Sequence, residues 1–355
     1  MNIYKATAFC LVLGFTALVL IFAKQLLIPL VLATLMWLLV DALRNRLMHV
    51  TILGQKLPGF AIPIISIITI TAVLMAFYAI FESQATLIVD SLPTYEEKMQ
   101  QRIASVSEYT GVDVEHWVNS AASSMDVSSM LSSVANSTGS LIASSILIII
   151  YVSFMLLEQS SGAKKLAKLA AVSPVFSVTR QILSDSSFQI KRYIWLKSVV
   201  SALTGFLSYL MLLYFGVDFP ELWAILAFML NFIPNIGSFL GVIFPSLLAL
   251  VQFDDFWSFA LVVLSLGLIQ FVVGNVFEPA YMGKSLNLSP LAILLSLSFW
   301  GMIWGIPGMF LAVPMMVATS IVLSHVPEMR WISILMSEDG ELAQAETKPT
   351  HNESL

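Results

Sequence analysis

The stretch Leu222–Val251 contains no charged side chain, yet a proline, a glycine and two amides interrupt its middle. Pro234 removes a backbone donor and clashes with the preceding turn, so a helix that enters this stretch should break or kink there. Gly237 then permits backbone angles that other residues resist. In hydrocarbon an unpaired backbone N–H or C=O is costly, so a broken backbone must face protein or a watery cavity. The stretch therefore predicts a membrane segment with a polar break, whose amides are Asn231 and Asn235.

Two interpretations of this break follow from the residues. The first is a proline kink with a close helix contact at the G-x-x-x-G pattern Gly237–Gly241, because small residues let membrane helices approach each other. The second is a transport pathway or a binding site. Two amides exceed what a packing kink requires, and polar groups inside a membrane are costly enough to indicate function. We favour the second interpretation.

A second uncharged stretch, Leu286–Ser324, is also interrupted at its middle, by the sequence G-M-I-W-G-I-P-G at Gly301–Gly308. Gly305 and Pro307 are the residues expected to break this helix. At the α-helical rise, arms of about 12 to 18 residues measure roughly 18 to 27 Å, which suits hairpins that enter the bilayer and turn back. With a single span between them, the hairpins would enter from opposite faces, as in transporters whose substrate site lies near the midplane. Tilted, proline-kinked full spans are the alternative.

The composition sets the class of protein. Apolar residues make up 58% of the 355-residue chain and charged residues 11%, against about 25% charged residues in soluble domains. We predict an all-α polytopic membrane protein with about six spanning helices, two broken or re-entrant helical hairpins and an amphipathic helical external insert. The spans are expected at Ala6–Ala23, Leu26–Val40, Gly59–Phe81, Leu141–Leu157, Ser198–Phe215 and Phe256–Phe277.

Several classes of function are not expected from these residues. The four histidines show no metal-ligand spacing. The sequence has no Ser-His-Asp order, phosphate loop or basic-aromatic stripe. We therefore predict no enzyme activity, no metal, no cofactor and no nucleic-acid partner. The single cysteine, Cys10, excludes a disulfide within the chain.

The charged residues are segregated along the chain. The 82–140 segment has eight acids and two bases, whereas the 158–197 segment has seven bases and two acids. Basic segments stay in the cytoplasm, so 158–197 and both termini are predicted inside and 82–140 outside. A disordered loop is the alternative for Ser120–Ser140. The predicted organisation is N-terminal membrane spans in 1–81, an external acidic amphipathic segment in 82–140, a span in 141–157, a basic cytoplasmic helical segment in 158–197, a transport core with both hairpins in 198–324 and a cytoplasmic tail in 325–355.

Three motifs make the chain similar to a known family. They are L-N-F-I-P-N-I-G-S at 230–238, G-N-V-F-E-P-A-Y-M-G at 274–283 and S-F-W-G-M-I-W-G-I-P-G-M-F-L-A-V-P at 298–314. With the acidic insert and the basic loop, the chain resembles the autoinducer-2 exporter family over nearly its whole length. The resemblance implies a multi-pass exporter in the bacterial inner membrane that forms a homo-oligomer, with a pentamer as the family expectation. The family is also associated with sodium/proton antiport, so the motifs are less specific for substrate.

Autoinducer 2 is a small, neutral, hydroxyl-rich molecule, and its recognition needs neutral donors and acceptors such as amides. A cation antiporter would instead need an ionisable group inside the membrane. Glu278 is the one good candidate for that group, and its alternative interpretation is a carboxylate at a helix end in the interfacial region. The candidate substrate-binding residues are Asn231, Pro234, Asn235, Gly237, Ser238, Gln270, Asn275, Glu278, Gly305 and Pro307.

We therefore predict an exporter of autoinducer 2 that works by alternating access at a polar site between the two hairpins. Its partners would be this solute, the lipid bilayer, further copies of the chain and, where transport is coupled, Na+ or H+. The alternatives are a sodium/proton antiporter of the same family and a non-transporting membrane scaffold or regulator that uses the acidic segment as a partner surface. A scaffold should tolerate substitution of Asn231 and Asn235, whereas a transporter should lose flux.

Overall fold

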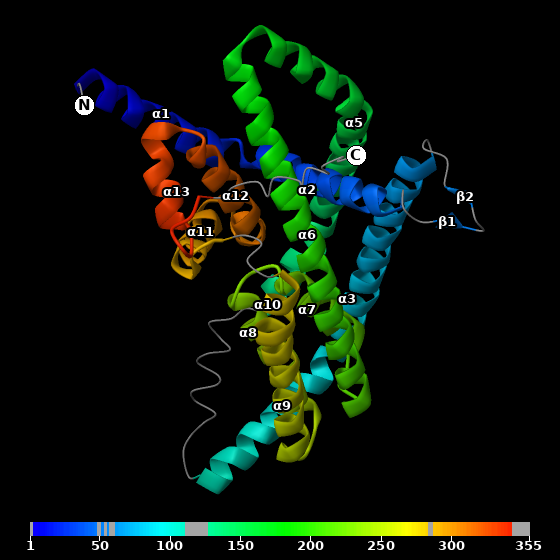
Figure 1. Ribbon diagram of the computed structural model, residues 1–355. Helices are drawn as coiled ribbons and strands as arrows, with labels where there is room; N and C mark the ends of the chain where they lie inside the picture. Colours follow the sequence, from blue (N-terminus) through cyan, green and yellow to red (C-terminus); the bar gives the residue numbers. More distant parts are fainter. Residues whose placement is uncertain are drawn as a thin grey trace. The chain divides into compact units, whose positions relative to one another are not determined.

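The computed structural model of the chain describes residues 3–47, 51–52, 55–56, 61–110, 127–282 and 287–342, most of them helical (Figure 1). These residues form two compact units. The first unit comprises Met1–Ser66, Leu147–Lys197 and Met282–Leu355, and the second comprises Ile67–Ile146 and Ser198–Tyr281. Three long helices belong partly to each unit: α3 (Ala61–Thr110), α5 (Val127–Val172) and α6 (Pro174–Phe215).

The first unit contains both ends of the described chain. Its first elements are α1 (Ile3–Phe22), α2 (Lys24–Leu47) and the two-residue antiparallel strands β1 (Thr51–Ile52) and β2 (Gln55–Lys56). Its last elements are α11 (Pro290–Trp304), α12 (Ile306–Ser324), a 3₁₀ turn at Pro327–Met329 and α13 (Arg330–Met336).

Helix α12 forms the centre of the first unit. Six of its apolar residues are at most 3% exposed: Leu311, Ala312, Val313, Met316, Val317 and Ile321. The Ser320 and Ser333 hydroxyls, both buried, lie 3.0 Å apart and fasten α13 to α12. The indole N–H of Trp304 donates to Leu20 O at 3.0 Å, which ties α11 to α1. Burial of apolar side chains and these few satisfied polar contacts hold the unit together.

The second unit packs short helices against the C-terminal half of α6. They are α7 (Pro220–Leu230), α8 (Ile236–Gln252), α9 (Phe256–Val272), a π-helical turn (Val273–Phe277) and α10 (Glu278–Met282). Its hydrophobic core consists of Leu212, Val217, Ala249, Val262 and Leu266. A Cβ atom at Gly205 of α6 would lie 2.8 Å from Ala224 O, so α6 and α7 are in close backbone contact.

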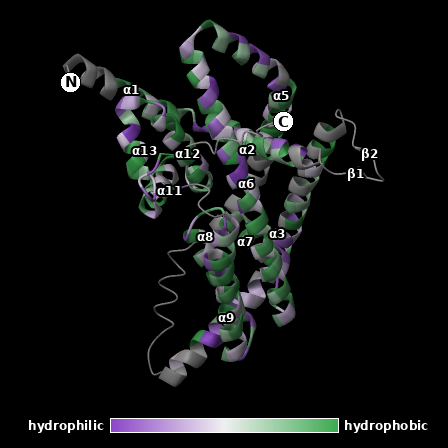
Figure 2. Cartoon of the chain, in the orientation of Figure 1, coloured by the Kyte–Doolittle hydropathy of each residue, from purple (hydrophilic) through white to green (hydrophobic). Residues whose placement is uncertain are grey.

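The apolar helices fit a membrane. Among the described residues, four helices are long and apolar enough to cross one, at Lys24–Arg44, Pro174–Phe215, Phe256–Tyr281 and Ile306–Ser324, and a bent pair, Ser144–Gln159 with Ser161–Val172, adds a fifth if it counts as one span. Apolar residues run along α8 and α9 (Figure 2). On α9, Leu264, Leu268 and Phe271 are 60–70% exposed, as expected for a helix surrounded by lipid. The protein is therefore an α-helical membrane protein, and the number of about six spans stays a prediction.

The predicted segment boundaries fall inside continuous helices. Helix α3 runs from the predicted third span to Thr110, α5 joins the external segment to the basic one, and α6 joins the basic segment to the predicted fifth span. The change from apolar to charged residues alters the surroundings of a helix without ending it, because Glu, Lys and Gln are good helix formers. The predicted transport core 198–324 also divides between the two units. Residues 111–126 and the tail after 342 lie outside the described residues.

Candidate functional site

The chain breaks at the first predicted position and reverses there. Helix α7 ends at Leu230 and α8 begins at Ile236. The Ile236 N–H donates to Pro234 O at 2.7 Å, which closes a γ-turn around Asn235 with φ 61° and ψ −52°. Helices of 11 and 17 residues measure about 17 and 26 Å, short of the roughly 30 Å of hydrocarbon. Since α7 and α8 pack against each other, they form a helical hairpin, as predicted, and not one kinked helix.

Gly237 and Gly241 allow α8 to pack closely against α7. A Cβ atom at position 237 would lie 1.7 Å from Leu230 O, and one at position 241 would lie 3.9 Å from Ala227 Cα. The first distance is impossible without movement of the backbone, because the obstructing atom is a main-chain carbonyl. The G-x-x-x-G pattern therefore serves packing within the hairpin, which was the first of the two interpretations of this stretch.

The amide of Asn231 lies in the interior of the second unit. Its side chain is 5% exposed, and its Nδ2 donates to Ser201 Oγ of α6 at 3.0 Å. Ser201 is fully buried, and Phe232 and Ile233 beside Asn231 are also buried. A buried amide costs free energy unless its hydrogen-bonding groups are paired. The break thus brings one polar pair, Asn231 and Ser201, into an apolar surrounding.

Serine and threonine residues of α6 continue this polar interior. Ser201, Thr204 and Ser208 are each at most 3% exposed, and Ser246 of α8 is 4% exposed with no hydrogen-bond partner for its hydroxyl among the described residues. These residues were not among the predicted site residues. Their spacing of three and four positions along α6 places them on one helix face, and this pattern of small polar residues in an apolar helix was the signal that could have identified them.

The other predicted residues of this region occupy different surroundings. Gln270 of α9 is 9% exposed, and its Nε2 lies 3.1 Å from where a Cβ of Gly241 would be. Asn235 is exposed, and Pro234 and Ser238 are half-buried. Asn275 is exposed within the π-helical turn, where its Nδ2 donates to Phe271 O at 3.0 Å, and Glu278 at the end of the turn is half-buried. The three predicted asparagines therefore do not share one buried pocket: Asn231 faces the interior, whereas Asn235 and Asn275 face outward.

The second break, in the first unit, uses the same construction with different residues. Gly305 has φ 66° and ψ −142°, and the half-buried Pro307 lies in the first turn of α12. A Cβ atom at Gly308 would lie 1.9 Å from Trp300 O, so this hairpin also closes a glycine onto a carbonyl of the preceding arm. The rings of Trp300 and Trp304, 4.8 Å apart and both buried, flank the contact. This break therefore has buried aromatic rings where the first has a buried amide.

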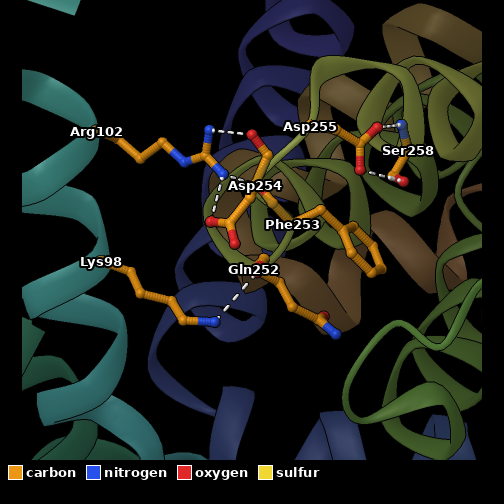
Figure 3. A network of polar contacts seen from close by, with 7 residues as sticks. All are labelled: Lys98, Arg102, Gln252, Phe253, Asp254, Asp255 and Ser258. Atoms are coloured by element: carbon orange, nitrogen blue, oxygen red, sulfur yellow. Dashed lines mark hydrogen bonds and ion pairs between the residues drawn. The ribbon is translucent and has the colours of Figure 1, made fainter. Parts of the chain in front are cut away.

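Helix α3 contacts the first hairpin at the C-terminal end of α8, away from the break. Arg102 donates to the backbone carbonyls of Phe253 and Asp254 and pairs with the Asp254 carboxylate at 3.1 Å (Figure 3). Lys98 donates to Gln252 O at 3.1 Å. These contacts attach α3 to the connection between α8 and α9. The carbonyls that end a helix need partners from outside the helix, and α3 supplies them here.

The neighbouring connection, between α6 and α7, has a similar contact with α3. The Tyr95 hydroxyl donates to Asp218 Oδ2 at 2.5 Å, and Gln84 Nε2 donates to Glu221 Oε2 at 3.2 Å. Burial and the hydrogen bond to the Asp218 carboxylate raise the pKa of Tyr95 above its usual value. Asp255 caps α9 by accepting from the Ser258 N–H at 2.7 Å, and this hydrogen bond lowers the pKa of Asp255. Asp255 thus has a structural role at the start of a helix.

The first unit contains a buried carboxylate that was not among the predicted site residues. Asp41 of α2 is 6% exposed and accepts from Lys191 Nζ of α6 and from Gln159 Nε2 of α5, the latter at 2.9 Å. Arg44 Nη1 lies 3.9 Å from the same carboxylate. Asp41 lies within the candidate span Lys24–Arg44. Charged groups in such segments are paired and often mark ion pathways. Among the described residues, no group of three or more His, Cys, Asp or Glu side chains could hold a metal ion.

Comparison with known proteins places the chain in a family. The AI-2E family transporter profile matches residues 9–328. The chain belongs to the AI-2E transporter family. It is 30% identical to the AI-2 transport protein TqsA of Escherichia coli K12 over 327 residues, which cover 89% of this chain and 91% of that protein. A putative transport protein of Borreliella burgdorferi is 32% identical over 71% of this chain and 69% of its own length, and one of Haemophilus influenzae is 28% identical over 80% and 83%.

Family membership and the apolar helices together make the chain a membrane transport protein. The relatives are transport proteins by name, which agrees with the prediction of a transporter of the autoinducer-2 exporter family. The matched region, residues 9–328, contains both hairpins and the Asn231–Ser201 pair.

Proposed function

We propose that the chain exports a small, neutral, hydroxyl-rich solute across the bacterial inner membrane, with autoinducer 2 as the first candidate. The observation that carries this proposal is the Asn231–Ser201 pair at the break of the first hairpin. Ser201 Oγ accepts from Asn231, so its own hydrogen can donate, and the Asn231 carboxamide oxygen can accept. The pair therefore offers a donor and an acceptor but no charge, which suits a polyol better than an ion. The similarity to a protein named for AI-2 transport supports the same solute.

The proposed mechanism is alternating access at the polar break of the first hairpin. The break of the first hairpin frees backbone groups that cannot face lipid, and an aqueous cavity at this break would satisfy them. Gln270 and Ser238 would extend the site on the first hairpin, and Asn235, Asn275 and Glu278 would line its approach. Movement of the hairpins relative to the rest of the protein would then expose the site to each side in turn.

Transport into and out of proteoliposomes tests the proposal. The purified chain would be reconstituted and the flux of autoinducer 2 measured with sodium and proton gradients imposed separately. Replacement Asn231→Ala removes the carboxamide that would bind a solute hydroxyl and leaves that hydroxyl unpaired in a desolvated site. It should cost on the order of 1–3 kcal/mol of solute binding, or about 5- to 150-fold in apparent affinity. Gln100→Ala, at an exposed position of α3, is the control and should retain the parental flux.

Two results would contradict the proposal. One is an Asn231→Ala variant that folds and transports autoinducer 2 at the parental rate, as a scaffold or regulator would allow. The other is a parental protein that moves sodium or protons and leaves autoinducer 2 in place.

Cation-coupled transport is the second candidate, and the buried Asp41 carboxylate favours it. Asp41 with Lys191 is an ionisable pair within a candidate span, and such pairs serve as proton or cation relays in transporters. Under this proposal, Asp41→Asn abolishes the dependence of flux on an imposed gradient. A variant that keeps the full dependence rules Asp41 out as the coupling group.

A further inference from the structure

An elbow joins the end of α5 to the start of α6, and its surface is both basic and apolar. The elbow comprises residues 164–183, and the helix is interrupted within it at Ser173, between α5 and α6. Val172, Val175 and Leu183 are 82%, 70% and 54% exposed, and Leu169, Phe176 and Val178 are exposed as well. Contiguous exposed apolar side chains are uncommon on surfaces that face only water and mark a contact with a membrane or a partner.

In the first turns of α6, exposed apolar residues lie on one face of the helix. At the α-helical periodicity, Val175, Val178 and Leu183 fall on one face, and Ser177, Gln181 and Ser184 fall on the opposite face. The start of this helix is fixed by the Phe176 N–H, which donates to Ser173 O at 3.1 Å. The amphipathic pattern therefore belongs to a formed helix whose apolar face is turned outward.

Four exposed bases accompany the apolar face: Lys164, Lys165, Lys168 and Arg180. The segment 158–192 contains two acids, and both already contact other groups. Glu158 pairs at 2.5 Å with Lys165, one of these four bases, and Asp185 faces His325 Nε2 at 3.7 Å. The elbow thus has an excess of positive charge next to its apolar residues.

The position of the elbow in the chain points to its partner. It follows the apolar helix Ser144–Gln159, and the next helical segment, Ser161–Val172, is bent by 54° from it. A basic, apolar segment that follows such a bend suits a course along the bilayer surface, where amphipathic helices place apolar residues below the headgroups and bases among the phosphates. A second copy of the chain fits less well, because it would bring two sets of like charges together.

We propose that the elbow binds the surface of the bilayer in which the protein is embedded, with Val172, Val175 and Leu183 at the acyl boundary and the four bases on anionic phospholipid headgroups. This contact concerns the lipid and is independent of the solute that the hairpins transport. It anchors the cytoplasmic-side ends of α5 and α6, as the charge pattern assigns them, to the membrane.

Fluorescence of a labelled full-length chain tests the elbow directly. Val175→Cys in a Cys10→Ser background would be labelled with an environment-sensitive dye and reconstituted in phosphatidylcholine alone or in equal parts phosphatidylcholine and phosphatidylglycerol. The expected result is a blue shift of emission, with quenching by lipids brominated on the acyl chain, that is larger in the anionic vesicles. The matched control is Gln181→Cys on the opposite face, whose dye should stay in water and resist quenching.

Removal of the four positive charges tests the electrostatic contribution to the contact between the elbow and the membrane. Replacement of Lys164, Lys165, Lys168 and Arg180 by Gln should reduce the quenching in anionic vesicles to the level in phosphatidylcholine. The proposal is overturned if position 175 shows no lipid quenching, or if quenching is equal in both vesicles. It is also overturned if the dye signal depends on dilution with unlabelled protein, since that result assigns the elbow to a second copy. Unchanged helix content and elution of each variant confirm that it has folded.

Discussion

Among single residues, Gly237 leaves the least room for a larger side chain. Its missing side chain leaves room for Leu230 O, which would lie 1.7 Å from a Cβ atom. We predict that Gly237→Ala forces α7 and α8 apart and costs about 1–3 kcal/mol of stability, the usual range for overpacking. The measurement is the thermal unfolding midpoint in detergent, which should fall.

Gly267→Ala is the matched control for this prediction. Gly267 lies inside α9, and a Cβ atom there would meet nothing within 4 Å, so the change should be neutral or stabilising by up to about 1 kcal/mol. Equal unfolding midpoints for the two alanine variants would show that the backbone at 237 has more room than the structure gives it.

Some features of single residues could be predicted from the sequence, and others could not. Pro234, Gly305 and Pro307 predicted both breaks because proline and glycine act on the local backbone. The expectation of unusual backbone angles at Gly237 was wrong: Gly237 lies inside α8, and the residue with positive φ at the first break is Asn235. The partner of Asn231 is Ser201, 30 positions earlier in the chain, and no local rule connects the two. The outward orientation of Asn235 and Asn275 was likewise beyond prediction, since it depends on which helix face packs inward.

At the scale of elements, α3 is a brace for the first hairpin. Its contacts through Arg102 and Lys98 reach the backbone between α8 and α9, not only side chains. We predict that Arg102→Gln with Lys98→Gln loosens this connection. Hydrogen exchange of residues 252–258 should become faster by about fivefold or more, the equivalent of roughly 1 kcal/mol of lost local stability.

The control for the brace is Gln100→Ala, an exposed position on the same helix, which should leave the exchange unchanged. If the double variant exchanges at the parental rate while keeping its fold, then α8 and α9 hold their connection without α3. The sequence predicted α3 as a span followed by a separate amphipathic segment. It could not predict one continuous helix, because the apolar-to-polar transition and the end of a helix have different causes.

At the scale of the whole molecule, the sidedness of the chain stays a prediction that follows from its charges. A cysteine at position 165, in a Cys10→Ser background, should react with membrane-impermeant reagents only from the cytoplasmic side, and one at position 97 of α3 only from outside. Labelling of position 165 from outside would reverse the topology and, with it, the assignment of entry and exit for the solute.

The γ-turn at the first break has a consequence for how this protein could be altered by selection. A non-glycine residue at φ 61° and ψ −52° is strained, and glycine at position 235 would relieve the strain. The second break already has glycine at its own strained position, Gly305. Selection for a sturdier protein would therefore favour Asn235→Gly, whereas selection for transport would retain the asparagine if its amide meets the solute. At position 235 the two selective pressures therefore favour different residues. At position 305 both allow only glycine.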